Sequence, residues 1–173
     1  MKIVSVNIYT FAELSDKAKE KALSDNADYN IYDTWYDVIY EDSDTMHLRI
    51  SAFDIDRRTI SIEFDSLPED TIQAIFKNVG NTAPLYLTAL KYENSRLELE
   101  RKYKEAIADE DEDEDEDSMS FEDTDDYEDW LDEFITALGE DYLSILIGEY
   151  EYQTSEDAIQ ASFEANDIHF TED

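Results

Sequence analysis

Carboxylates are the residues of this sequence whose number and spacing could support chemistry, and they gather toward its C-terminal end. The 173 residues include 47 Asp and Glu against 13 Lys and Arg, which gives a formal net charge of −34. Residues 109–129 hold fifteen acids, nine of them consecutive, and no Lys or Arg follows Asp109. Like charges in such a run repel one another and bury nothing. The run therefore predicts a solvated surface that attracts cations or cationic proteins.

A calcium site is the most specific chemistry that this spacing could support. With Asp111 at position 1 of an EF-hand loop, Asp113, Asp115 and Glu122 occupy positions 3, 5 and 12. Glu116, however, stands where the loop needs Gly, and any repeat of Asp and Glu satisfies the first three positions. We therefore expect weak, diffuse binding of divalent cations, with no defined metal site and no cofactor.

Nucleophilic catalysis finds little support in the sequence. The chain has no Cys, no GxSxG motif and no Gly-rich phosphate loop. Its two histidines, His47 and His169, fall in predicted strands, where a lone His is more often structural than catalytic. Among 47 carboxylates a close pair arises by chance, so no acid–base pair of the glycosidase kind can be singled out. The sequence predicts a non-enzymatic protein without catalytic residues.

The composition also bounds the fold class, the compartment and the partners. A chain that is 42% hydrophobic and 13% aromatic is folded, because disordered acidic chains are poor in aromatics. The absence of Cys fits a reducing cytoplasm. No apolar run suits a signal peptide or a membrane span. The net charge disfavours direct contact with nucleic acid or an anionic membrane and favours a basic protein as partner.

Hydrophobic periodicity in the N-terminal half predicts strands and amphipathic helices. Residues 2–9 alternate as a half-buried strand, and a helix over 16–26 follows an N-cap at Ser15. An amphipathic helix is expected over Ile31–Met46. Clean alternation then predicts two strands of a hairpin over residues 47–53 and 59–64, which should join the first strand in one antiparallel sheet.

The C-terminal half reads as mostly helical. A helix with Pro68 in its first turn ends at Gly80, and two long helices follow over residues 84–108 and 127–152. We expect these two to form an antiparallel hairpin with the acidic insert 109–126 near its tip. A capped short helix after Thr154 and a fourth strand near the C-terminus complete the prediction.

The predicted fold class is α+β, with a small antiparallel sheet of three or four strands packed against helices and a long acidic helical hairpin. We expect one domain over residues 1–173. Its parts are a core over 1–80, the helical hairpin over 84–152, and the C-terminal helix and strand over 154–173.

Four stretches in this order resemble a family of small uncharacterised phage and prophage proteins. They are YTFAELSDKAKEKAL, WYDVIYED, SAFDIDR and EYEYQTSEDAIQASFEANDIHFTED, and the resemblance covers nearly the whole chain. It implies a phage context and a host-cytoplasm location, but no reaction and no catalytic residues. The chain departs from the family pattern at Gly139 and Gly148, where larger helix formers are expected, and at Ser51 and Arg58, where the family has Gly.

The charge itself is the remaining functional signal, and we expect acidic side chains to contact a basic partner. Crowded like charges on a folded body cost stability, so a function should offset that cost. The first candidate set comprises Asp109, Glu110, Asp111, Glu112, Asp113, Glu114, Asp115, Glu116, Asp117, Glu122, Asp123, Asp125, Asp126, Glu128, Asp129, Asp132 and Glu133. The second is a predicted helical ridge of Asp33, Asp37, Glu41 and Asp44.

Carboxylates three or four residues apart on a helix lie about 5–6 Å apart and could imitate the phosphates of a nucleic acid. In composition the chain is similar to phage DNA-mimic inhibitors of restriction and CRISPR systems. The leading hypothesis is a non-enzymatic inhibitor that occupies the nucleic-acid-binding surface of a host defence protein. The alternative is an antitoxin or chaperone-like partner of a basic protein unrelated to nucleic acid, and the sequence leaves a homodimer open.

Overall fold

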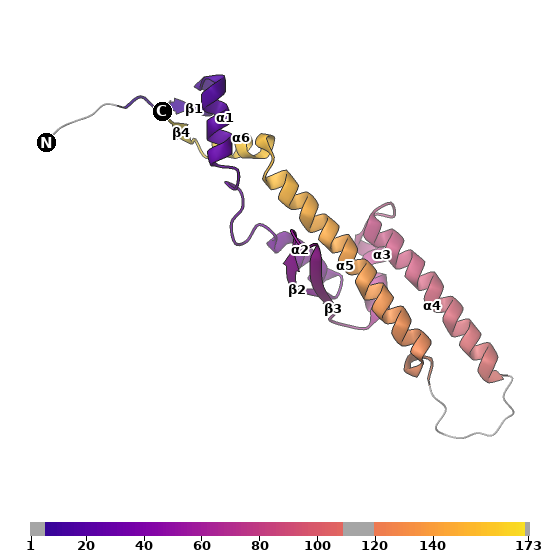
Figure 1. The fold of residues 1–173 in the computed structure, drawn as a ribbon. Helices are drawn as coiled ribbons and strands as arrows, with labels where there is room; N and C mark the ends of the chain where they lie inside the picture. The colour runs from indigo at the N-terminus through magenta and orange to yellow at the C-terminus, as the bar shows by residue number, and fades with distance from the viewer. Residues whose placement is uncertain (1–5, 109–119, 172–173) are drawn as a thin grey trace. The chain divides into compact units, whose positions relative to one another are not determined.

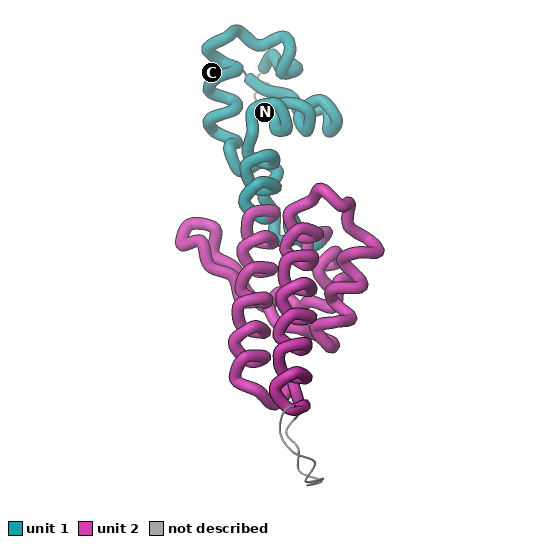
Figure 2. Tube along the Cα trace, turned by 90° about the vertical axis from the view of Figure 1, so that its right-hand side faces the viewer, with its two compact units in different colours: residues 1–37, 146–173 teal, residues 38–145 magenta. Residues whose placement is uncertain are grey.

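The described residues of the computed structural model, 6–108 and 120–171, form a mixed α+β fold, as predicted. They contain six α-helices and two separate two-stranded antiparallel sheets. The chain divides into two compact units, residues 1–37 with 146–173 and residues 38–145 (Figure 2). Helix α5, Asp125–Gln153, contributes residues to both units.

The first unit is built on a short sheet and two helices. Strand β1, Tyr9–Thr10, pairs antiparallel with β4, His169–Phe170. Helix α1, Asp16–Asp25, and helix α6, Glu156–Ala165, contribute to one apolar cluster. The N-cap of α6 is Ser155, whose hydroxyl accepts a hydrogen bond from the Ala158 amide at 3.3 Å. The buried residues of the cluster are Phe11, Leu14, Ala22, Ile159 and Phe163.

The expected strand over residues 2–9 is wrong for residues 6–8, and the expected single sheet is wrong as well. Residues 6–8 form no strand, and Val6 and Ile8 are 61% and 62% exposed. In this sheet Tyr9 lies opposite Phe170 and Thr10 opposite His169. The N-terminal strand therefore pairs with the C-terminal one, and the hairpin pairs only within itself.

Helix α2 spans Asp37–Thr45 and is shorter than the helix expected over residues 31–46. Four-residue turns precede it, with the Trp35 amide donating to the Tyr32 carbonyl at 3.0 Å and the Asp37 amide to the Thr34 carbonyl at 3.1 Å. The Trp35 ring packs on Tyr150 at 5.8 Å between ring centroids. The aromatic spacing that suggests a helix therefore arises in part from a turn whose rings pack into the first unit.

The second unit combines a β-hairpin with helices (Figure 1). Strands β2, Leu48–Asp54, and β3, Thr59–Phe64, pair in register with Leu48 opposite Phe64 and a bulge between Ile50 and Ala52. Helix α3 spans Pro68–Asn78, and α4 spans Pro84–Ala108. Helix α4 and the part of α5 in this unit lie side by side and antiparallel in both views, as the sequence predicts (Figures 1 and 2).

Aromatic residues hold the two long helices together. The Trp130 indole N–H donates to the Tyr92 carbonyl at 3.0 Å, which connects α5 to α4. Phe134 is fully buried, and its ring lies 5.2 Å from that of Tyr92, 5.4 Å from that of Trp130 and 5.6 Å from that of Phe64. One side of α5 is thereby fixed against both α4 and the hairpin.

The two helical glycines of α5 differ in what surrounds them. A methyl group built on Gly139 would lie 3.1 Å from Ile62 Cγ2 and 3.2 Å from Ile60 Cγ2, whereas Gly148 has nothing within 4 Å. Gly139 therefore permits the close approach of α5 and β3.

We expect Gly139→Leu to lower the free energy of unfolding by about 1–3 kcal/mol through overpacking. Gly148→Leu should raise it by about 0.5–1 kcal/mol through helix propensity. Urea unfolding compares them, and equal effects would contradict the packing argument.

Candidate partner-binding surface

The structure places eight acids of the first candidate set on or just before α5. Glu122 and Asp123 lie in a 3-10 turn, Phe121–Asp123, and the others lie in the first three turns of the helix. All eight are exposed: Glu122, Asp123, Asp125, Asp126, Glu128, Asp129, Asp132 and Glu133. The nine residues Asp109–Asp117 lie outside the described residues.

Six of these acids form what we call the α5 acidic face, namely Asp125, Asp126, Glu128, Asp129, Asp132 and Glu133. At 3.6 residues per turn they fall within an arc of about 160°, opposite the buried Trp130 and Phe134. At 1.5 Å of rise per residue, their six charges span about 12 Å, or one per roughly 2 Å. Duplex DNA carries one per about 1.7 Å of axis. The linear charge density of the face is therefore close to that of DNA.

Part of this acidic segment has a local structural role. Asp123 Oδ2 accepts hydrogen bonds from the Ser120 hydroxyl at 2.8 Å and the Ser120 amide at 3.1 Å, and these bonds lower the pKa of Asp123. Phe121 is buried between the rings of Tyr103, at 5.8 Å, and Tyr127, at 5.2 Å. Asp123 is therefore a cap of the turn and the member of the set least available to a partner.

Acids in the first turn of a helix also interact favourably with its dipole, each by about 0.3–1 kcal/mol. Asp125, Asp126 and Glu128 occupy that turn of α5. Asp129, Asp132 and Glu133 lie beyond it, so the helix dipole does not account for them. Their charges are the ones that most need another explanation.

Helix α4 shows the opposite arrangement, because its acids are neutralised within the helix. Glu98 and Glu100 accept hydrogen bonds from Lys102 and Lys104, and these bonds lower the pKa of both carboxyls. The ion pairs within α4 are Arg96 with Glu93 at 3.0 Å and with Glu100 at 3.5 Å, Lys102 with Glu98 at 3.0 Å, Lys104 with Glu100, and Arg101 with Glu105 at 2.6 Å. In the described part of the chain, no Lys or Arg forms an ion pair with the α5 acidic face. The two antiparallel helices therefore differ sharply in uncompensated charge.

The second candidate set does not form the ridge that the sequence predicts. Asp33, Asp37, Glu41 and Asp44 are all exposed, but α2 begins only at Asp37. Asp33 lies in the turns before the helix, so the four residues do not share one helical face. The ridge is a weaker candidate than the α5 acidic face.

The two histidines differ in their setting. His47 lies just before β2 with a φ of 58°, so its predicted place in a strand is wrong. His169 lies in β4, and its Nδ1 is 2.8 Å from the Asp167 carbonyl oxygen. His169 therefore has a local backbone partner, which fits a structural side chain.

No family model, curated protein or solved structure matches this chain. Among residues 6–108 and 120–171, no group of three or more His, Asp or Glu side chains is placed to hold a metal ion. No helix in that part of the chain is long and apolar enough to cross a membrane. The function must therefore be inferred from the chemistry of the described surface.

Asp141 is an acid of α5 that faces inward instead of outward. Its Oδ2 atom is buried without a hydrogen-bond partner among the described residues. Burial raises its pKa and the neighbouring charge of Glu140 adds to the increase, while a hydrogen bond from Thr88 opposes it. The folded state binds the Asp141 proton more tightly than the unfolded state does. The resulting stabilisation is fully present at pH values below the ordinary pKa of an Asp carboxyl. That contribution is lost as the pH rises through the raised value.

We therefore expect Asp141→Asn to raise the free energy of unfolding at neutral pH by about 1 kcal/mol. The gain should shrink as the pH falls through the pKa of Asp141, where the wild-type carboxyl becomes neutral. Asp132→Asn, an exposed change on the same helix, should shift stability by no more than about 0.5 kcal/mol. Chemical unfolding at several pH values measures both, and a gain for Asp141→Asn that did not depend on pH would be inconsistent with this explanation.

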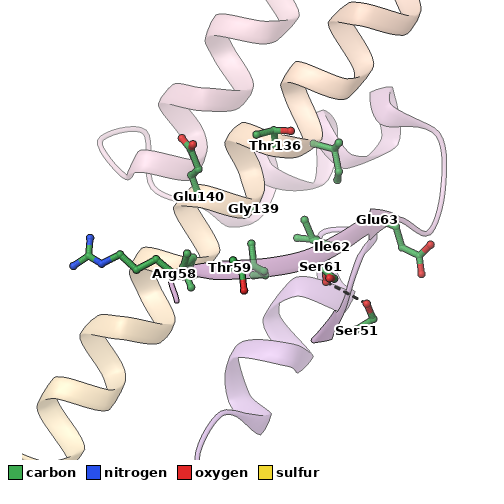
Figure 3. A pocket seen from close by; sticks show the side chains of 12 residues that line it. Ser51, Arg58, Thr59, Ser61, Ile62, Glu63, Thr136, Gly139 and Glu140 are labelled. Carbon is green, nitrogen blue, oxygen red and sulfur yellow. Dashed lines mark hydrogen bonds between the residues drawn. The ribbon is translucent and has the colours of Figure 1, made fainter. Parts of the chain in front are cut away.

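A groove of about 590 Å³ between β3 and α5 is a feature that the sequence reasoning missed (Figure 3). Thr136, Gly139 and Glu140 line its α5 side. The signal available in the sequence was Gly139 itself, a small residue inside a long amphipathic helix. Only the structure shows that this glycine lets β3 pack closely against α5.

Proposed function

We propose that this protein is a non-enzymatic inhibitor that imitates nucleic acid and occupies a basic nucleic-acid-binding surface of a host defence protein. The observation that carries the proposal is the α5 acidic face, where six exposed carboxylates lack basic partners in the described residues at a linear charge density close to that of DNA. The phage context and the host-cytoplasm location are proposed from the sequence resemblance.

The contrast between α4 and α5 supports this choice over a merely solubilising surface. A solubilising surface needs net charge, but it does not need six unpaired acids on one helical face. Leaving all six charges of one helical face unpaired increases self-repulsion, and a cationic groove on a partner would relieve it. Complementary charge would also steer the two proteins together and speed their association.

The proposed contacts on described residues are the α5 acidic face and Glu122. Asp109–Asp117 extend the proposed contact set along the sequence, and Asp33, Asp37, Glu41 and Asp44 form a secondary proposed set. Asp123 is placed last because its carboxylate caps the turn at Ser120.

The test is affinity capture from a bacterial host lysate at moderate salt. The tagged protein is compared with a six-amide variant, defined as Asp125→Asn, Asp126→Asn, Glu128→Gln, Asp129→Asn, Asp132→Asn and Glu133→Gln. A nucleic-acid-processing defence protein retained by the wild type and lost with the variant would support the proposal. A broad set of ribosomal and other basic proteins, or a single partner without nucleic-acid activity, would overturn it.

A further inference from the structure

The groove beside α5 follows one edge of the β-hairpin. Strand β3 lines it with every residue from Thr59 to Glu63, whereas β2 contributes only Ser51. Successive side chains of a strand point to opposite faces. An unbroken run of lining residues therefore places the groove along the edge of β3 and not over one face of the sheet. Figure 3 shows Arg58 and Glu63 toward opposite ends of this row, with Thr136 and Glu140 on the neighbouring helix.

That edge of β3 has no strand partner in the described part of the chain. Strand β3 pairs with β2 alone, and no backbone hydrogen bond from a loop in residues 6–108 or 120–171 reaches residues 59–63. An unpaired edge is a template for an added strand from another chain. The five residues 59–63 of β3 extend about 17 Å, which is the length of an ordinary strand. The edge is long enough to accept a peptide of similar length.

The chemistry of the groove selects the occupant. Its floor is apolar, with Ile60, Ile62, Ile135 and Leu143, and its sides carry Glu63 and Glu140. A second depression shares Thr136 and Glu140 with the groove and is also lined by Asp132 and Glu133 of the α5 acidic face. Arg58 is the only Lys or Arg among the described lining residues. These features favour a cationic segment, and they disfavour a second copy of a chain whose net charge is −34.

We propose that an extended segment of the basic partner, with alternating apolar and cationic side chains, adds to the edge of β3 as an extra strand. Its main chain pairs with β3, its apolar side chains cover the floor, and its cationic side chains meet Glu140 and the adjoining acids. This inference rests on the proposed function for the partner being a basic protein. It adds the place and the conformation in which one segment of that partner binds.

The experiment uses an acetylated and amidated peptide of about ten residues that alternates Lys and Val, a length that covers one strand edge. A matched peptide is N-methylated at every residue, which keeps the side chains and charge but removes the backbone donors. Thr136→Trp is the groove variant, because it fills the groove from an exposed position without changing the charge. Fluorescence anisotropy measures affinity, and amide NMR shifts locate the binding site.

We expect the unmodified peptide to bind the wild type about ten-fold more tightly than the N-methylated peptide does. Its binding should shift the amide NMR signals of residues 59–63. Thr136→Trp should weaken its binding about ten-fold. Equal binding of the two peptides, no binding, or shifts confined to the acids of α5 would overturn the proposal. A partner captured from lysate could be lost with the six-amide variant but fully retained by Thr136→Trp. That result would contradict the proposed groove site but not the proposed function.

Discussion

Conversion of the α5 acidic face to amides is expected to weaken binding to a basic partner by about 100-fold, which corresponds to about 2.7 kcal/mol. Six exposed charge pairs at about 0.5 kcal/mol each supply that amount. Because the interaction is between solvent-exposed charges, wild-type affinity should also fall steeply with added salt, and the six-amide variant should show a flatter dependence. Titration of the captured partner at several salt concentrations, by calorimetry or anisotropy, measures both effects.

The matched control for this prediction lies on α4. Glu98→Gln with Glu105→Gln also removes exposed carboxylates, but these acids already have intrahelical partners in Lys102 and Arg101. The control pair should leave affinity within about two-fold of the wild type. If the α4 and α5 variants weakened binding equally per charge removed, only the net charge would matter and the face would have no specific role. Circular dichroism must show that each variant remains helical.

Phe134→Ala is expected to have the largest effect on stability, a loss of about 3–5 kcal/mol in the free energy of unfolding. The ring is fully buried and contacts rings from α4, β3 and its own helix. Its removal leaves a cavity at a place where all three elements meet. Phe134→Leu should cost less, because it keeps most of the apolar volume. Urea unfolding followed by fluorescence provides the measurement.

Leu97→Ala on α4 is the control for this second prediction. Leu97 is 49% exposed, so its truncation should cost less than about 1 kcal/mol. A similar loss for Leu97→Ala and Phe134→Ala would contradict the view that the aromatic cluster fixes α5. The acidic face depends on this cluster, because the same turns of α5 carry Trp130 and Phe134 inward and Asp129, Asp132 and Glu133 outward.

Regular periodicity made the second unit predictable from the sequence. The alternating apolar residues of β2 and β3 gave both strands, and the three- and four-residue apolar spacing gave α4 and α5. Pro84 marked the start of α4 correctly. In these elements local propensity and burial pattern agree, so one sequence signal was sufficient.

The first unit was less predictable because its elements are short and depend on distant partners. Strand pairing between Tyr9 and Phe170 joins the two ends of the chain, and nothing in the local pattern of residues 2–9 shows where it stops. The aromatic spacing around Trp35 resembled a helix, but its ring contact with Tyr150 accompanies a turn instead. Tertiary contacts decided both cases.

The sequence predicted which acids form the candidate surface, but not that their charges lack basic partners in the described residues. The sequence predicted the exposure of the acids from Asp125 to Glu133, because they fall outside the apolar stripe of Tyr127, Leu131 and Phe134. It could also have shown that the acids of α4 have basic residues four positions away, as Glu98 and Lys102 do. The groove along β3 could not be predicted, because it exists only where Gly139 lets α5 approach Ile60 and Ile62.

Competition with duplex DNA tests the central claim most directly. The captured partner is first saturated with a fluorescent duplex of roughly 20 base pairs, which exceeds the length of the proposed acidic surface, and this protein is then titrated in. We predict that the anisotropy of the duplex falls to that of free DNA, and that the six-amide variant fails to displace the duplex. A ternary complex that holds DNA and this protein together on the partner would contradict the claim.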